Sequence, residues 1–145
     1  MPIPHPTLRR PVRTPEELTT RWEIVAVLGR GLDDPPAPDQ EASDLWIQLF
    51  DATGHAHGVL VVVEGVEPAP DDELTGNLAG VLAHLLTLEV DGEGAAAVAL
   101  VPRAPRDVVV DDLAWAEALR TACRADGVPL LGVHLVSGVH ARPLL

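Results

Sequence analysis

Two histidines separated by one residue, His55 and His57, are the first side chains in the sequence that suggest metal chemistry. On a strand, residues i and i+2 point to the same side, so both imidazoles could bind one zinc ion. The pair lies between Gly54 and Gly58 in a turn-like segment, and no third ligand is adjacent. It therefore fits an exposed hairpin tip with two solvated histidines at least as well as a metal site.

Five further side chains could in principle carry chemistry, and for most of them a structural role is the simpler interpretation. Glu64 ends an apolar run, where it is a base or ligand, or a solvated strand end. Asp111 and Asp112 precede a helical pattern, where carboxylates cap free backbone N–H groups. His134 lies in an apolar segment, which favours a core histidine over a ligand. Cys123 falls on the buried side of its helix without a nearby histidine, so we interpret it as a small hydrophobe.

Two arginines, Arg103 and Arg106, flank Pro105 directly after an apolar run. In many α/β sheets this edge binds ligands, so the pair could hold a small anion or simply solvate a loop. All ten basic residues are arginine, and lysine is absent. The absence of lysine excludes Schiff-base chemistry and a Walker-type phosphate loop. Neither serine lies in a G-x-S-x-G elbow.

The elements that must position these residues follow from hydrophobic periodicity and turn signals. The pattern predicts an α/β fold: a mixed β-sheet with a β-hairpin and about three flanking helices. The run IVAVL at 24–28 could also be a strand. The expected helices are 14 to about 30, 71–88 and 111–125; the expected strands are 44–51, 59–64, 95–101, 130–136 and 139–144.

Each of the last two helices has an apolar stripe that should face the core. His84 is expected at the edge of the packed face of the first of them. The residues expected to pack are Leu74, Leu78, Val81, Leu82 and Leu85 on 71–88, and Leu113, Trp115, Ala116, Leu119 and Cys123 on 111–125.

Chain length and net charge limit the number of domains and the kinds of partner that are possible. The 145 residues are divided into an extended arm, 1–13, and one α/β domain, 14–145. The net charge of −12 argues against a nucleic-acid partner, because phosphates would be repelled. The arm and the acidic, proline-rich segment 32–43 could mediate contacts, but we favour disordered tails.

Composition and processing signals point to a cytoplasmic protein without a membrane anchor. One cysteine excludes an internal disulfide, no apolar run is long enough to span a bilayer, and residues 1–13 lack the apolar stretch of a secretory signal. The bias towards alanine, proline, valine, aspartate and arginine is typical of a genome of high GC content, such as an actinobacterial one.

The stretch 95–138 resembles the JAB/MPN (JAMM) metalloprotease-like fold, and is most similar to its RadC-like branch. The shared features are a buried small-residue strand ending at Val101, a proline-containing loop, a helix opening with Asp112, then Gly127-Val128-Pro129 and a strand ending at Ser137-Gly138. The preceding hairpin and flanking helices fit the same order, so the resemblance covers most of 14–145.

Active members of this family place His-x-His-Pro after the strand and Ser-x-x-Asp at the next helix start, and these histidines and the aspartate hold zinc. Here the matching loop reads Pro102-Arg103-Ala104-Pro105, and Val109 stands at the serine position. Asp112 matches the family aspartate, and Glu64 stands at best near the upstream glutamate that acts as base. One ligand of three cannot hold catalytic zinc.

The resemblance therefore implies a vestigial site at Glu64, Pro102, Arg103, Ala104 and Asp112, with no cofactor and no catalysis. We expect a protein-binding or scaffold module, with an unknown protein partner or a homodimer. The alternative is a divergent metal-dependent hydrolase in which the fold brings His55, His57 or His134 beside Asp112. A third reading, a regulator of the anti-sigma-antagonist type, lacks the expected phosphorylatable residue followed by glycine at a helix start.

Overall fold

The computed structural model describes residues 10–30, 42–90 and 93–145, which form three helices and five strands. Their order confirms the predicted α/β class, and residues 24–28 belong to a helix, so the strand alternative is wrong. The elements are α1 (Pro15–Arg30), β1 (Ser43–Phe50), β2 (Ala56–Val66), α2 (Asp72–Glu89), β3 (Ala95–Pro102), α3 (Val110–Ala125), β4 (Leu130–Ser137) and β5 (His140–Pro143).

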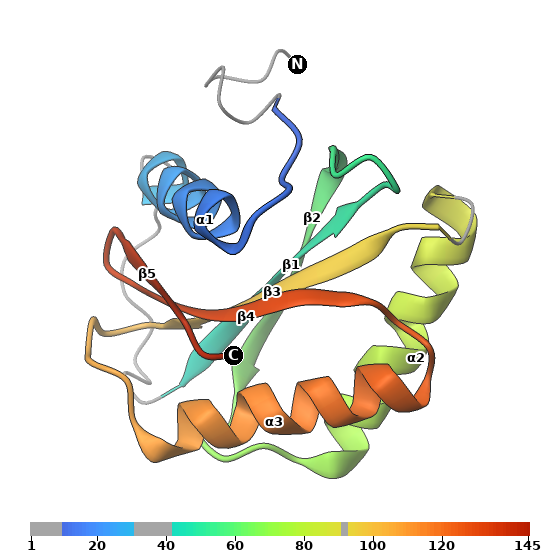
Figure 1. Ribbon diagram of the computed structural model, residues 1–145. Coiled ribbons are helices and arrows are strands. Elements are labelled where there is room, and N and C mark those ends of the chain that lie inside the picture. The colour runs from blue at the N-terminus through green and yellow to red at the C-terminus, as the bar shows by residue number, and fades with distance from the viewer. Residues whose placement is uncertain (1–9, 31–41, 91–92) are drawn as a thin grey trace.

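The strands form one mixed sheet in the order β2-β1-β3-β4-β5 (Figure 1). β1 and β2 are the predicted antiparallel hairpin, and β1 also pairs antiparallel with β3. β3 and β4 are parallel, so the chain must cross over between them, and α3 makes that connection. β5 returns antiparallel to β4.

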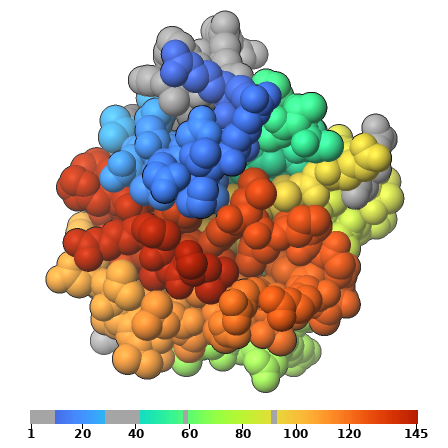
Figure 2. All heavy atoms as spheres, viewed as in Figure 1, coloured from blue at the N-terminus to red at the C-terminus, as the bar shows by residue number. Residues whose placement is uncertain are grey.

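Helices cover both faces of the sheet, which makes three layers (Figure 1). One face packs against α2 and α3, and the other packs against α1 through Leu18, Trp22 and Ala26. Figure 2 shows α1 seated directly on the chain around β4 and β5. β3 is buried on both faces, which explains why its sequence is small, apolar and continuous.

The hairpin turn is held by the carboxylate of Asp51, which accepts hydrogen bonds from the backbone of Thr53 and His55 at 2.9 and 3.0 Å. This tight turn lets β2 start at residue 56, three positions earlier than predicted. Val12 packs beside it: its N–H donates to Gly54 O at 2.8 Å. The end of the predicted arm is therefore docked on the hairpin, and residues 1–9 lie outside the described residues.

Two of the residues predicted to pack do not. The side chains of Val81 and Leu113 are 52% and 51% exposed, whereas Leu82 and Leu119 on the same helices are almost fully buried. Both exposed residues lie at the margin of their apolar stripe, where the neighbouring layer no longer covers the helix. Among the described helices, none is long and apolar enough to cross a membrane.

Truncating one core leucine tests this packing. Leu119→Ala should lower the free energy of unfolding by about 3 kcal/mol, because it leaves a cavity at a site that is 1% exposed. The matched change on the same helix, Leu113→Ala, should cost less than about 0.5 kcal/mol. Urea denaturation of both variants measures the difference, and equal losses would contradict the observed orientation of α3.

Candidate functional site

The carboxyl ends of the parallel strands β3 and β4 meet the start of α3 at one edge of the sheet. The loop from Arg103 to Val109 joins β3 to α3 there. The backbone N–H of Arg106 donates to Ser137 Oγ, at the end of β4, at 2.7 Å. The predicted vestigial residues Pro102, Arg103 and Ala104 all lie in or beside this loop.

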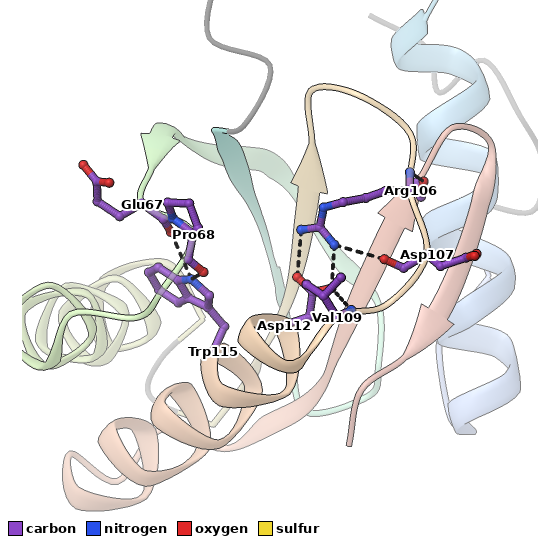
Figure 3. Close-up of polar contacts among 8 residues, drawn as sticks. Glu67, Pro68, Arg106, Asp107, Val109, Asp112 and Trp115 are labelled. Carbon is purple, nitrogen blue, oxygen red and sulfur yellow. Dashed lines mark hydrogen bonds and ion pairs between the residues drawn. The ribbon is translucent and has the colours of Figure 1, made fainter.

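An ion pair between Arg106 and Asp112 is the centre of this edge (Figure 3). The two guanidinium nitrogens Nη1 and Nη2 donate to Oδ2 and Oδ1 of Asp112 at 2.6 and 2.8 Å. The Asp112 side chain is 2% exposed, whereas that of Arg106 is 34% exposed. The hydrogen bond to Asp112 raises the pKa of Arg106. Both carboxylate oxygens of Asp112 are therefore bound to a cation supplied by the chain itself.

The same carboxylate also fixes the first turn of α3. Asp112 Oδ2 accepts a third hydrogen bond from the backbone N–H of Val109 at 2.8 Å. The capping role expected for Asp111-Asp112 thus belongs to Asp112, which reaches back to the residue before the helix. One turn later, Trp115 Nε1 donates to the carbonyls of Glu67 and Pro68 at 3.2 and 3.0 Å (Figure 3). These contacts tie α3 to both the β3 loop and the β2–α2 connection.

The second loop arginine, Arg103, has its own carboxylate partner. Its Nη2 lies 3.3 Å from Oδ1 of Asp44, at the start of β1. The same oxygen accepts the N–H of Gly65 at 3.0 Å. Arg103 therefore links the ends of three adjacent strands, β2, β1 and β3.

These two ion pairs bear on the anion hypothesis. Arg103 and Arg106, the two residues that the sequence analysis considered as ligands of a small anion, each already form an ion pair with a carboxylate. An open depression of about 540 Å³ does lie beside the loop. However, its lining places Asp107 next to Arg106, so its charge is mixed. It is lined by Pro105, Arg106, Asp107, Ser137, Gly138, Val139 and His140.

The structure does not bring the candidate zinc ligands together. His55 Nδ1 lies 2.8 Å from Thr53 Oγ1 at the exposed hairpin turn. His57 Nε2 lies 3.1 Å from Glu89 at the end of α2. His134 is buried under α1 on the opposite face of the sheet from α3. Within 10–30, 42–90 and 93–145, no three His, Cys, Asp or Glu side chains are grouped as a metal site requires.

The buried histidine has one hydrogen-bond partner. His134 Nε2 lies 2.8 Å from Thr19 Oγ1 of α1, and among the described atoms its Nδ1 has none. Burial lowers the pKa of His134 to about 4, because the charged imidazolium is poorly solvated there. The prediction of a core histidine is confirmed in its burial, and the residue is neutral at pH 7.

The remaining candidates have ordinary surroundings. Glu64 is exposed on β2, next to Gly65, which binds Asp44. Cys123 is 1% exposed in the core, as predicted, and burial raises its thiol pKa. His84 is on the exposed side of α2 rather than at the edge of the packed face.

Sequence reasoning missed Asp44 and Arg21. Asp44 is 59 residues from its partner Arg103, so no spacing could indicate the pair. Arg21 is buried beneath the hairpin, where its guanidinium lies 5.5 Å from the Phe50 ring centroid and donates to Gln48 Oε1 at 3.3 Å. Its place in the helical period, next to Trp22, is the only sequence signal for this burial.

The chain matches no protein-family model and no curated protein sequence.

Removing the arginine of the central ion pair should destabilise the fold. Arg106→Ala leaves a buried, unpaired carboxylate at Asp112, so we expect a loss of about 2 kcal/mol in the free energy of unfolding. The control is Arg120→Ala, which removes an exposed i,i+3 pair with Glu117 and should cost less than about 0.5 kcal/mol. Adding Asp112→Asn to Arg106→Ala should recover part of the loss; a double variant with additive losses would contradict the coupling.

The pKa of His134 predicts an acid-sensitive fold. Between its ordinary pKa of 6.5 and its folded value of about 4, the unfolded chain binds a proton that the folded chain does not. The contribution of His134 to the free energy of unfolding is therefore fully present above pH 6.5. It decreases as the pH drops towards 4, by at most about 3 kcal/mol. Urea denaturation between pH 7 and 4.5 should show a steeper fall for the wild type than for His134→Gln. The exposed His55→Gln should follow the wild type, and parallel profiles for all three proteins would refute the assignment.

Proposed function

We propose that the chain is a non-catalytic JAB/MPN-like domain that serves as a protein-binding or scaffold module. The observation that carries the proposal is the pairing of Asp112. In the resemblance this residue matches the family's zinc-binding aspartate, and both of its carboxylate oxygens accept hydrogen bonds from the Arg106 guanidinium, at 2.6 and 2.8 Å.

The loop chemistry supports the same conclusion. The residues at the two family histidine positions are Pro102 and Ala104, and neither side chain has a donor atom for a metal. A catalytic zinc site needs three protein ligands and an open position for water. The residues at this edge therefore do not fit zinc, and a fixed guanidinium supplies the positive charge instead.

The order of elements is the second support. A hairpin, a helix, a buried small-residue strand, a crossover helix and a parallel strand follow one another as the resemblance implies. The agreement concerns the fold, and fold alone does not assign function. The absence of a ligand set around Asp112 is what favours binding over hydrolysis.

Among the contacts of the described residues, none favours the alternative hydrolase. It needs His55, His57 or His134 beside Asp112, and the described partners of these four residues are Thr53, Glu89, Thr19 and Arg106 respectively.

A zinc measurement tests the proposal directly. Untagged protein purified without chelator and dialysed against zinc should retain far less than one zinc per chain by elemental mass spectrometry. The reason is that only Asp112 stands at a ligand position. One tightly bound zinc per chain would overturn the non-catalytic assignment.

A restoration variant tests the resemblance itself. The triple change Pro102→His, Ala104→His and Arg106→Ala rebuilds the family ligands and frees the Asp112 carboxylate. It should gain about one zinc per chain, detected by titration and by a rise in thermal stability with added zinc. Two controls separate the steps: Arg106→Ala alone should bind none, and Pro102→His with Ala104→His should bind more weakly than the triple variant. A folded triple variant, verified by circular dichroism, that binds no zinc would contradict the JAB/MPN-like assignment.

A further inference from the structure

The two edges of the sheet differ in how they are protected. β5 forms one edge with only four residues, His140–Pro143, and it carries Arg142 and Pro143. Short length, charge and proline are the usual devices that stop an edge strand from pairing with another chain. β2 forms the other edge with eleven residues and contains no proline. Among the described strands, it pairs with β1 alone.

The exposed edge at β2 is apolar. Between His57 and Glu64 the sequence carries no charged residue. Val61 and Val63 pack against the core beneath the sheet, whereas Leu60 and Val62 are 36% and 46% exposed on the face that α1 covers elsewhere. Within the described residues, β2 is a long edge strand with one partner strand and no charged side chain from 58 to 63, and such an edge is suited to accept another strand.

A flank of α2 continues this surface on the other face. Residues 74–88 include no aspartate, glutamate or arginine. A side chain at Gly80 would point to Asp126, directly after α3, so this side of the helix faces α3. Val81 lies about 100° further around the helix. Leu88 follows Val81 by seven residues, or two helical turns, so both side chains lie on the same side of α2. They are 52% (Val81) and 63% (Leu88) exposed.

The flank of α2 that carries Val81 therefore lies about a quarter-turn from the side that faces α3. Figure 1 shows α3 in front, beneath β4, with α2 behind it towards the hairpin side of the sheet. Val61 and Val63 of β2 pack against the core cluster that includes Leu78 and Leu82 of α2. In addition, His57 Nε2 of β2 lies 3.1 Å from Glu89 at the end of α2. The apolar flank of α2 and the edge of β2 thus lie on one side of the molecule.

We propose that this side binds a second copy of the chain, with β2 pairing antiparallel to its counterpart across a two-fold axis. The inference deepens the proposed binding function and rests on it by naming the partner. Two-fold pairing makes one sheet of both copies and keeps each face continuous, so in a register centred on Val61 the Leu60 side chain of one copy meets Val62 of the other. The same axis brings the two α2 flanks together beneath the joined sheets.

Charge is the reason to choose a second copy as the occupant. Two chains of net charge −12 repel one another wherever acidic residues meet. The proposed surface is formed by two segments of this acidic chain that contain no aspartate, glutamate or arginine, 58–63 and 74–88. A register centred on Val61 separates the two Glu64 carboxylates by six positions, roughly 20 Å, which exceeds the screening length at physiological salt. Pairing of the β2 edges in this register therefore does not place the two Glu64 carboxylates opposite one another.

The test is the mass in solution of the full chain and of two matched variants. By light scattering between about 1 and 100 μM, the wild type should have twice the monomer mass of 15.4 kDa. Val62→Arg adds a charge to the β2 edge, and should raise the dissociation constant by about 100-fold. Val27→Arg, at a position 56% exposed on α1, should leave the dimer intact. Both variants should keep the wild-type circular dichroism spectrum, because both positions are exposed.

Hydrogen exchange adds a readout specific to strand pairing. The backbone amides of residues 60–63 should be slower to exchange in the wild-type dimer than in monomeric Val62→Arg. A monomeric wild type, or a dimer that Val62→Arg leaves unchanged, would overturn the proposal. A dimer lost with Val81→Arg but kept with Val62→Arg would also overturn it, because the contact would then be helical. The dimer test measures mass and hydrogen exchange, whereas the non-catalytic assignment is tested by zinc content. A failure of one proposal can therefore be distinguished from a failure of the other.

Discussion

The ion pair between Arg106 and Asp112 is the contact on which the arrangement of β3, α3 and β4 depends. A carboxylate that is 2% exposed is stable only with a full set of partners, and Arg106 supplies two of the three hydrogen bonds. The backbone of the same arginine binds Ser137 at the end of β4. One network therefore joins all three parts of the crossover between the parallel strands, and it fixes where α3 begins.

The order of elements was predictable because each has a local signal. Small apolar residues mark the buried strand β3. An acidic residue precedes α2, and Asp71 caps this helix: its Oδ1 accepts from the backbone N–H groups of Glu73 and Leu74. The ion pairs were not predictable. Arg106 and Asp112 were interpreted separately, one as a candidate anion ligand and the other as a helix cap. Sequence spacing cannot show that a loop folds back over the first turn of the next helix.

The two misplaced core residues have a common cause. Periodicity locates the centre of an apolar stripe, but the neighbouring layers decide how wide the buried part is. α2 is covered by the sheet on one side and by α3 on another, so Leu82 is buried while Val81, 100° away, is not. His84 was misplaced for the same reason. The part of the α2 stripe that extends beyond the buried face is therefore exposed, on the same side of the molecule as β2, which among the described strands pairs with β1 alone.

An arginine and a zinc ion satisfy a buried carboxylate in different ways, and the difference bears on the proposed function. Zinc requires several ligands held at fixed positions and leaves a polarised water, whereas a guanidinium satisfies both oxygens by itself and offers no Lewis acid. With Arg106 in place, α3 stays anchored without any demand on the residues at 102 and 104. That freedom is consistent with the Pro102 and Ala104 found there. A fold anchored in this way needs no metal centre to hold α3, and the β2 edge, which has no charged residue from 58 to 63, is the surface that we propose for a partner.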